Sequence, residues 1–412
     1  MELPVGVKKI IKPLLAAGHE AYLVGGSVRD LLLGRLPHDH DIVTTATPDQ
    51  VMELFDRVVP VGLQHGTVTV IEKGLQVEVT SIITLCQDLR RRDFTVNAMA
   101  MDLSGVIYDC FGGREDLQHQ VIRAVGQAQR RFREDPLRLL RAVRQAVVLD
   151  FTIDCKTGFS IAENSYLLRT AAPERVREEL NKILLSGRPA RGIALLNSFD
   201  LLGQIFPEFA CTEAFQEQIE HLKKFLDATP QNLSIRLAAL LSAMVKAIHL
   251  KKTRREALEA SGNGLNMVRL ILTRLKYSKQ IIEQVLLFVQ ESIDFKDRLS
   301  TVELKRLIGR LGYQNLDDFF NLLLAEAQTG VCEFTAVGVE ACREKSKEII
   351  DRKEAILISE LAINGNDLLA MGFAPGPELG SILNHLLDMV LEKPELNNRH
   401  SLKALVRSKW RQ

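Results

Sequence analysis

The fold of the first third of the chain is set by the stretch AYLVGGSVRDLLLG, residues 21–34. Its first four residues form a short apolar run that predicts a strand, and residues 28–33 have the pattern of a helix. Gly25, Gly26 and Ser27 therefore stand at a strand-to-helix turn. Such a turn can point backbone N–H groups at a phosphate, and an ordinary Gly-Gly turn is the alternative.

Two carboxylates follow in the segment Asp39-His40-Asp41. In an extended segment residues i and i+2 share a face, so both carboxylates point the same way and His40 points the opposite way. Carboxylates this close repel one another unless cations neutralise them, and hard oxygen ligands of this kind suit Mg²⁺. A solvated loop is the alternative.

Glu78 is a candidate third carboxylate. In residues 75–80 apolar and polar side chains alternate, which predicts a strand with Glu78 on its polar face. An exposed strand position without a functional role is the alternative that the spacing leaves open.

Strand patterns are confined to the first third of the chain, whereas helical periodicity prevails from Asp135 onward, and no proline occurs between Pro230 and Pro375. At about 150 residues per domain, the 412 residues suffice for several domains. We expect an α+β head with a small mixed sheet, followed by an all-α neck, body and tail. The expected strands are residues 22–24, 42–44, 67–71 and 75–80, and the expected domains are residues 1–125, 126–190, 191–295 and 296–412.

The composition is that of an ordinary globular protein, with 46% hydrophobic and 25% charged residues, which excludes fibrous and largely disordered classes. The net charge is only +1, so a polyanionic partner must be met by a local basic face. The longest charge-free apolar run, residues 237–245, is too short to cross a bilayer, and the first residues lack the layout of a signal peptide. We therefore expect a cytosolic protein without a membrane partner.

The six cysteines lie far apart and form no CxxC motif. This spacing indicates neither a disulfide framework nor a zinc site. We expect reduced cysteines that mostly serve as packing residues.

The dipeptide Asp135-Pro136 predicts a helix start, with Asp135 as the N-cap. Arg138, Arg141 and Arg144 then recur every three residues along one drifting face. By itself this pattern also describes an ordinary capped and solvated basic helix.

Taken in order, several segments closely resemble the signature blocks of the class II tRNA nucleotidyltransferases. These segments are residues 25–34, 39–41, 91–98 (RRDFTVNA) and 134–144 (EDPLRLLRAVR), with residues 174–180 (ERVREEL) similar to the last neck element of the family. Enzymes of this family add the 3′-terminal CCA of tRNA and share their catalytic head with bacterial poly(A) polymerases. The resemblance is dense from about residue 20 to residue 210, and the remainder is compatible with a helical body and tail.

The resemblance implies a role for each matching position. Gly26 and Arg29, in the block that also contains Gly25 and Ser27, correspond to residues that contact the incoming nucleotide, and Arg92 corresponds to another nucleotide contact. Asp39 and Asp41 correspond to metal ligands. Asp93 and Asn97 belong to the ribose-recognising block, and Asp135, Arg138, Arg141 and Arg144 belong to the nucleotide-selecting helix. It also implies two Mg²⁺ ions at turnover, one on the two aspartates and one on the triphosphate. We do not expect His38, His40 or His65 to act as bases.

An Asp-Arg pair on that helix makes chemical sense as a reader of bases. A carboxylate accepts a hydrogen bond from an exocyclic amine, while a guanidinium donates one to a ring nitrogen. Cytosine and adenine offer this donor and acceptor side by side, whereas guanine and uracil present the opposite polarity. A pair of protein side chains can thereby replace a nucleic-acid template.

The last residues contain Arg399, Lys403, Arg407 and Arg411 at intervals of four, which form one cationic stripe on a helix. Together with the basic run at residues 251–255, this stripe suits the phosphates of a tRNA acceptor arm. A solubilising terminal helix is the alternative.

Residues 81–90 form a short connector between the Glu78 strand and the Arg-Arg-Asp block. Complete CCA-adding members carry a longer flexible loop there, and a shortened loop resembles CC-adding members, whose product a separate A-adding relative finishes. We therefore expect CC addition with CTP. A complete CCA-adding enzyme that also uses ATP is the main alternative, ahead of a poly(A) polymerase or a non-catalytic RNA-binding relative.

Overall fold

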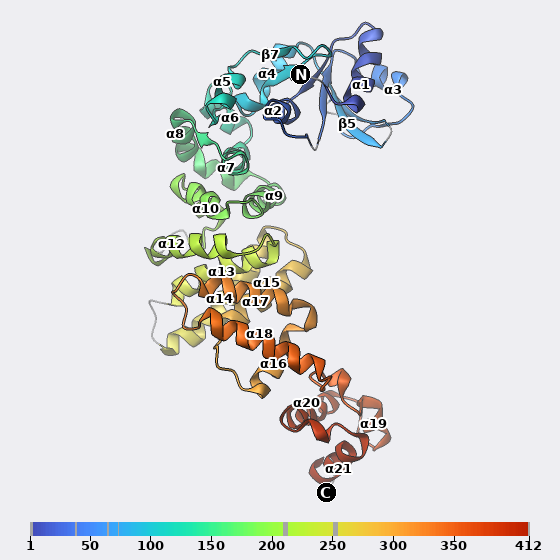
Figure 1. Cartoon of the computed structure of the whole chain (residues 1–412), viewed down its shortest axis with the longest axis vertical. Coiled ribbons are helices and arrows are strands. Elements are labelled where there is room, and N and C mark those ends of the chain that lie inside the picture. Colours follow the sequence, from blue (N-terminus) through green and yellow to red (C-terminus); the bar gives the residue numbers. More distant parts are fainter. Residues whose placement is uncertain are drawn as a thin grey trace. The chain divides into compact units, whose positions relative to one another are not determined.

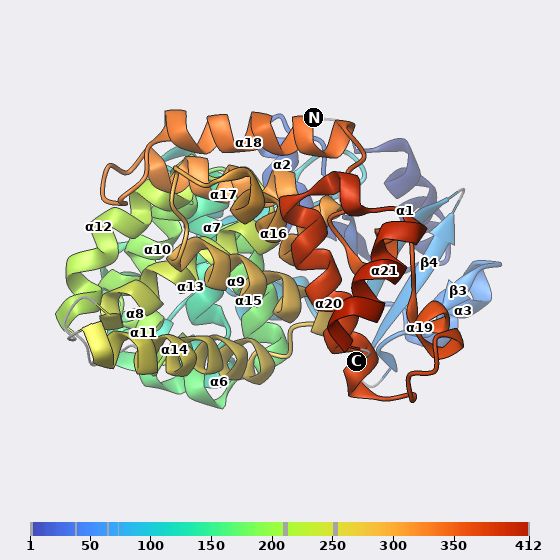
Figure 2. The same cartoon turned by 90° about the horizontal axis from the view of Figure 1, so that it is seen from below.

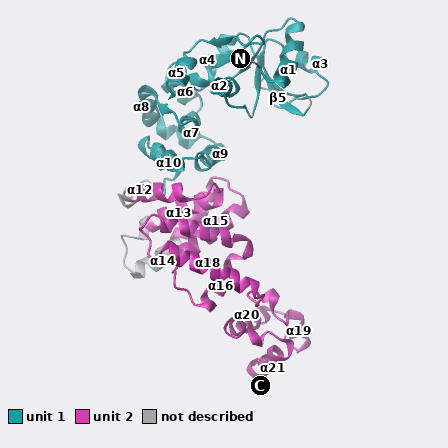
Figure 3. Cartoon of the chain, in the orientation of Figure 1, with its two compact units in different colours: residues 1–210 teal, residues 211–412 magenta. Residues whose placement is uncertain are grey.

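The computed structural model describes residues 3–37, 39–63, 66–72, 74–208, 213–249 and 254–410, with side chains except at 213–217, 247–249 and 254–263. The chain divides into two compact units, Met1–Ala210 and Cys211–Gln412 (Figure 3). None of the described helices combines the length and the apolar character needed to cross a membrane. The finer division at residues 125, 190 and 295 stays a prediction.

The first unit begins with a seven-stranded mixed sheet in the order β3-β4-β5-β2-β1-β6-β7. Its strands are β1 (Ala21–Val24), β2 (Asp41–Thr44), β3 (Val58–Val59), β4 (Thr67–Glu72), β5 (Leu75–Ser81), β6 (Met99–Met101) and β7 (Ile107–Asp109). Strands β2 and β5 are parallel, and the other neighbours are antiparallel. The four expected strands are confirmed, whereas β3, β6 and β7 were not expected, because two or three residues are too few to show alternation.

The β2–β5 register defines the two faces of the sheet. Asp41 lies opposite Glu78, and Ile42 lies opposite Val79. Ile42 and Val79 are buried, so the carboxylates belong to the other face. The alternation expected for residues 75–80 is confirmed, because Val77 and Val79 are buried while Gln76 and Glu78 are exposed.

Five helices accompany this sheet. They are α1 (Val5–Ala16), α2 (Gly26–Leu32), α3 (Pro48–Leu54), α4 (Leu85–Arg91) and α5 (Gly113–Gln118), with a 3₁₀ turn, η2, at Thr95–Asn97. Helices α1 and α3 lie beside β4 (Figure 2). Helix α4 packs Leu85 and Leu89 into an apolar cluster with Val24 and Val43, which anchors it on the sheet next to the carboxylates.

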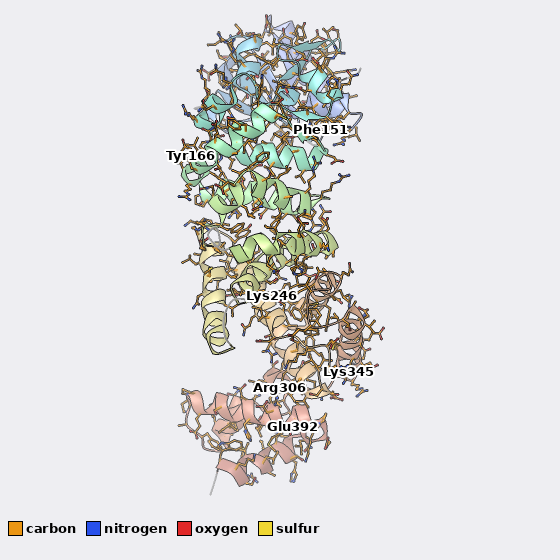
Figure 4. The ribbon with its side chains drawn as sticks, turned by 90° about the vertical axis from the view of Figure 1, so that its left-hand side faces the viewer. Phe151, Tyr166, Lys246, Arg306, Lys345 and Glu392 are labelled. Carbon is orange, nitrogen blue, oxygen red and sulfur yellow. The ribbon has the colours of Figure 1, made fainter. Side chains whose placement is uncertain are left out.

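The rest of the first unit is helical. Its elements are α6 (Ala128–Glu134), α7 (Arg138–Leu149), α8 (Cys155–Asn164), η3 (Ser165–Thr170), α9 (Pro173–Leu184), α10 (Pro189–Ser198) and α11 (Leu201–Ile205). A two-residue parallel ladder, β8 (Val121–Ile122) with β9 (Thr152–Ile153), lies among them, so strands are not confined to the first third of the chain. Phe151, directly before β9, is buried, and Tyr166 in η3 is exposed (Figure 4).

Helix α7 is held by α9 and α10 (Figure 1). Its apolar face, which includes Leu139, Leu140 and Val143, is buried. Gly192 in α10 has no room for a side chain, since a Cβ there would lie 2.3 Å from the Cγ2 of Ile183 in α9. This close packing fixes α7, and the arginines on its other face with it.

The expected helix start, with Asp135 as the N-cap, is two residues too early. Asp135 ends α6, Leu137 is the N-cap of α7, and the helix begins at Arg138. Asp135 Oδ1 accepts the backbone N–H of Leu137 at 3.1 Å. The carboxylate therefore caps a turn that precedes the helix. In the sequence, an Asp-Pro pair that begins such a turn looks the same as one that begins a helix.

The second unit contains no strand among its described residues, in agreement with the expected helical body and tail. Its helices are α12 (Glu213–Ala228), α13 (Leu233–His249), α14 (Arg254–Arg274), α15 (Lys279–Ile293), α16 (Thr301–Leu311), α17 (Leu316–Ala327), α18 (Ala336–Asp351), α19 (Gly365–Ala370), α20 (Pro377–Glu392) and α21 (Arg399–Trp410), with 3₁₀ turns η4 (Tyr313–Asn315), η5 (Ile358–Glu360) and η6 (Pro394–Leu396).

Helix α13 is buried on all sides and not on a single face, because every residue from 234 to 245 is buried. It packs against α12, α14, α15 and α17. At its end Lys246, labelled in Figure 4, pairs with the buried Glu326 of α17. The last three helices have their own apolar core, which includes Leu368, Leu386 and Leu402.

The described cysteines are free thiols. The expectation that most of them serve packing is wrong, since Cys86, Cys110 and Cys155 are exposed and only Cys342 is buried. Cys211 lies outside the described residues.

Candidate active site

A pocket of about 790 Å³ opens in the first unit. Its lining residues are Gly26, Ser27, Arg29, Asp30, Arg35, Leu36, Asp39, Asp41, Arg91, Arg92, Asp93, Asn97, Asp135, Arg138, Arg141, Arg144, Gln145, Val148, Leu149 and Arg175. Every residue expected to bind nucleotide or metal is among them except Gly25 and Glu78. The fold thus brings segments more than 100 positions apart in the sequence into one cavity, and the individual roles of these residues stay predictions.

The carboxylates lie where strand β2 begins. Asp41 is its first residue, and the hydroxyl of Ser27 fixes the preceding loop by donating to the carbonyl oxygen of Asp39 at 2.6 Å. Burial raises the pKa of Asp41, with Arg92 opposing the shift and Asp39 adding to it. Burial, followed by repulsion from Asp41 and Asp39, also raises the pKa of Glu78. A cation would relieve this repulsion.

These donors fit Mg²⁺ bound by few protein ligands. The described residues contain no group of three His, Cys, Asp or Glu side chains arranged to hold a metal ion. Two aspartates with open coordination positions remain, which suits an ion that keeps waters and shares substrate phosphates. His40 is buried between them, as expected for a packing residue, and burial lowers its pKa despite both aspartates. His38 and His65 lie outside the described residues.

The absence of a side chain at Gly25 leaves room for the guanidinium of Arg92 beside Asp41. Its φ of 75° and ψ of −139° are accessible to glycine and strained for other residues. A Cβ at this position would lie 2.6 Å from Nη1 of Arg92 and 3.6 Å from Oδ2 of Asp41. The missing side chain therefore lets the Arg92 guanidinium reach the turn, where the buried Asp88 orients it through a bond of 3.0 Å to Nε.

A polar network crosses the pocket between α2, η2 and α7. Arg29 Nη1 donates to Asn97 Oδ1 at 2.7 Å, and Asn97 Nδ2 donates to Asp93 Oδ1 at 3.2 Å. Arg141 of α7 contacts Asp93 Oδ2 through Nε at 2.8 Å and Nη2 at 2.7 Å. Burial raises the pKa of Asp93, but the bonds from Arg141, Asn97 and the Phe94 amide outweigh it, so the pKa is lowered overall. Asp93 is thus a buried anion that holds Arg141.

The other residues expected on the selecting helix are also held. Arg138 Nη2 donates to the carbonyl of Arg91 at 2.9 Å. Arg144 pairs with the buried Glu179 of α9, with 2.6 Å between Nε and Oε2. Asp135 pairs with Arg175, with 3.0 Å between Oδ2 and Nη2. Arg141 and Arg144 therefore neutralise buried acids, whereas Asp135 pairs with a more exposed partner, Arg175.

Comparisons with known proteins agree with this geometry. Residues 21–84 and 80–123 match the poly A polymerase head domain, residues 150–212 an RNA and SrmB binding site of polymerase A, and residues 263–406 the tRNA nucleotidyltransferase domain 2. A CCA-adding enzyme of Lactiplantibacillus plantarum is 34% identical, with 96% of this chain and 94% of that protein covered. The chain belongs to the class II tRNA nucleotidyltransferases.

Further relatives span the same length. The CCA-adding enzyme of Levilactobacillus brevis is 33% identical, with 97% of this chain and 96% of that protein covered. The crystal structure of the Bacillus stearothermophilus CCA-adding enzyme in complex with CTP superposes with a TM-score of 0.77 at 29% identity, and it covers 98% of this chain and 97% of that chain. The similarity of this nucleotidyltransferase to its relatives thus includes both units.

Several residues that line the pocket of this tRNA nucleotidyltransferase, or support residues that line it, were not predicted. Arg175 lies within the neck block, which was recognised without a role for this position. Gln145 accepts from Arg29 Nη1 at 3.2 Å, and the only sequence signal was its place next to Arg144. Asp88, which orients Arg92, gave no local signal, because its importance depends on tertiary contacts.

The expected cationic stripe of the last helix is partly neutralised. Arg399 and Lys403 both contact Asp367 Oδ1, at 2.5 and 2.9 Å. Their hydrogen bonds, that of Lys403 first, lower the pKa of Asp367 to about 2. Arg407 lines a small pocket of about 340 Å³ beside them, and Arg411 lies outside the described residues, as do the side chains of the basic run at residues 251–255.

Replacing Gly25 by alanine tests whether the position of Arg92 matters for catalysis, provided that the loss of rate and the loss of stability are measured separately. We expect Gly25→Ala to cost about 1–3 kcal/mol of unfolding free energy through backbone strain, and to lower the rate of nucleotide addition by about tenfold or more, since Arg92 must leave its place beside Asp41. Chemical denaturation and single-turnover kinetics measure the two effects.

Gly34→Ala is the matched control. Gly34 also has a positive φ, of 70°, but a Cβ there would meet no atom within 4 Å. It should lose stability and keep its rate. A folded Gly25→Ala variant with the wild-type rate would contradict the role given to Arg92.

Proposed function

We propose that this tRNA nucleotidyltransferase adds two cytidines to the 3′ end of tRNA, using CTP and releasing pyrophosphate. The main support is the pocket itself, which is lined both by the paired carboxylates Asp39 and Asp41 and by the base-reading candidates Asp135 and Arg138. The relatives named CCA-adding enzymes and the neighbour solved with CTP support the same substrates.

Asp39 and Asp41 would hold Mg²⁺, which, with a second ion on the triphosphate, would make the tRNA 3′-hydroxyl more acidic and stabilise the leaving pyrophosphate. The guanidinium of Arg92 lies near Asp41, where it can bind a phosphate oxygen of the incoming nucleotide. Arg29 is oriented by Asp30, with 2.7 Å between Nη2 and Oδ1, and lines the same pocket. No covalent protein intermediate is needed, because positioning and charge stabilisation suffice for phosphoryl-type transfer.

Asp135 and Arg138 are the proposed base readers. A carboxylate offers about four lone-pair sites, and Asp135 uses some of them for Leu137 and Arg175, so it keeps capacity for an exocyclic amine. Arg138 is fixed by the carbonyl of Arg91 and by Glu134, which leaves further N–H groups for a ring acceptor. This arrangement favours cytosine and adenine over uracil and guanine.

The restriction to cytidine rests on the connector between β5 and α4. Strand β5 ends at Ser81 and α4 begins at Leu85, so residues 82–84 alone join them. The amide of Ile82 donates to the carbonyl of Thr44 at 2.8 Å, and Thr84 caps α4 by accepting from the Gln87 amide at 3.4 Å. A segment this short and this well anchored offers no mobile length with which to refit the pocket from CTP to ATP.

Addition of the complete CCA is the second candidate, favoured by the names of the relatives that match both units. Under that proposal the pocket accepts adenine after the second cytidine without a mobile loop. Poly(A) synthesis and RNA binding without catalysis are less favoured, because the carboxylates and the base-reading pair are present together.

Replacing Asp41 by asparagine should abolish nucleotide addition and leave the fold intact. Burial and neighbouring carboxylates raise the pKa of Asp41, so a neutral amide of the same shape does not destabilise the protein. Loss of the metal is worth several kcal/mol at the transition state, and we expect the rate to fall by about a hundredfold or more. Asp49→Asn, at an exposed position of α3, is the control that should keep full activity. Near-wild-type turnover of folded Asp41→Asn in Mg²⁺ would refute the proposed metal site.

Sequencing the product ends should show a stop after two cytidines. A tRNA lacking CCA is incubated with CTP alone, ATP alone, or both, and Asp41→Asn protein purified in parallel reveals any contaminating transferase. Replacement of residues 82–84 by the longer loop of a complete CCA-adding enzyme should restore some ATP use. Products ending mainly in CCA from the native protein would overturn the CC restriction, and long adenosine tails with ATP alone would indicate a poly(A) polymerase.

A further inference from the structure

Two exposed cysteines of the first unit lie side by side outside the nucleotide pocket. Cys86 is the second residue of α4, and Cys110 directly follows β7. Their Sγ atoms are 3.0 Å apart and share a hydrogen bond. Twenty-four positions separate them in the sequence, so their proximity is created by the fold.

We propose that Cys86 and Cys110 form a redox site that a peroxide converts to a disulfide, and that this disulfide slows nucleotide addition through helix α4. One of the two thiols, as its thiolate, attacks an oxygen of the peroxide and becomes a sulfenic acid, and the departing hydroxide takes up the proton of that thiol and leaves as water in the case of hydrogen peroxide. The sulfur of the other cysteine then displaces the sulfenic hydroxyl, and its thiol proton leaves with that hydroxyl as a second water. Two electrons pass from the two sulfurs to the peroxide, and an added dithiol reverses the step by exchange.

The geometry requires little movement for this bond. A disulfide needs about 2.05 Å between sulfurs, so the two atoms must approach by roughly 1 Å. The hydrogen bond with Cys86, followed by burial, raises the pKa of Cys110 to about 11. Either cysteine can make the first attack, and both routes give the same disulfide.

The segment on the Cys110 side is rigid. The carboxylate of Asp109 accepts the backbone amides of Phe111 at 3.2 Å, Gly113 at 2.8 Å and Arg114 at 2.8 Å. The segment that carries Cys110 thus holds its shape when the sulfurs approach. Because Asp109 holds the Cys110 segment, the approach of the sulfurs displaces the first turn of α4, which carries Cys86.

Movement of α4 reaches the pocket directly. Asp88, two residues after Cys86 in α4, orients both Arg91 and Arg92 through its two carboxylate oxygens. The carbonyl of Arg91 in turn accepts from Arg138 at 2.9 Å. A shift of about 1 Å in reacting groups is enough to lower a rate by large factors. The disulfide would thus act on the phosphate-binding and base-reading sides of the pocket together.

The test uses the full chain and two independent readouts. Protein treated with hydrogen peroxide is blocked with a thiol reagent and mapped by peptide mass spectrometry, and the initial rate of CTP incorporation is measured before oxidation, after it, and after addition of dithiothreitol. We expect a peptide pair joined through Cys86 and Cys110, and a rate lower by about tenfold that the dithiol restores. Disulfide formation does not depend on whether the product ends in CC or CCA, so the proposed nucleotide specificity can fail separately.

Cys86→Ser and Cys110→Ser should keep their rates under peroxide, whereas Cys155→Ser, which removes an exposed thiol of α8, should respond like the wild type. Absence of the joined peptides would overturn the proposal. A disulfide without loss of rate, or an equal loss of rate in Cys86→Ser, would overturn the coupling through α4.

Discussion

The buried ion pair between Asp93 and Arg141 is the contact on which the active site depends. Asp93 belongs to the block after α4, and Arg141 belongs to α7, so this contact joins the sheet to the neck helices. Removing one partner of a buried pair costs about 3–5 kcal/mol, and the partial exposure of Arg141 favours the lower end of that range. The pair thus joins the block that follows α4 to the helix that carries the base-reading candidate Arg138, and both line the same pocket.

The same cavity also contains repulsion that the fold does not relieve. After burial, Asp41 and Asp39 raise the pKa of Glu78, and Asp39 raises that of Asp41, where Arg92, ahead of His40, opposes the shift. Because bound Mg²⁺ relieves the repulsion between these carboxylates, and because Mg²⁺ also binds the phosphates of a nucleotide, we expect metal and nucleotide to strengthen each other's binding. The position of Arg92 depends on Gly25 and Asp88. The contacts that hold this part of the head together therefore also place the guanidinium that lies beside Asp41.

Features that depend on neighbouring residues could be predicted from the sequence. The Gly25-Gly26 turn, the aspartates at 39 and 41 and the alternation around Glu78 are local patterns, and each is present in the structure. The ordered blocks of the family then added the positions of α7.

Features that depend on distant partners could not be predicted. The start of α7 was misplaced, because the side chain of Asp135 caps a turn and contacts Arg175, forty positions away. Asp88 and Asp367 look like ordinary surface acids in the sequence, yet one is buried to orient Arg92 and the other neutralises Arg399 and Lys403. The exposed pair Cys86 and Cys110 was likewise invisible as a pair.

The central claim is that protein side chains select the base, and the ratio of kcat/KM for CTP to that for UTP tests it most directly. Asp135→Asn keeps an acceptor for the turn but offers an amide donor to uracil, and Arg138→Ala removes the donor to cytosine N3; the exposed Arg130→Ala is the control. The claim predicts that the CTP preference falls by about 1–3 kcal/mol, roughly fivefold to more than a hundredfold, in the first two variants and stays unchanged in the control. An unaltered preference in folded Asp135→Asn and Arg138→Ala protein would contradict it.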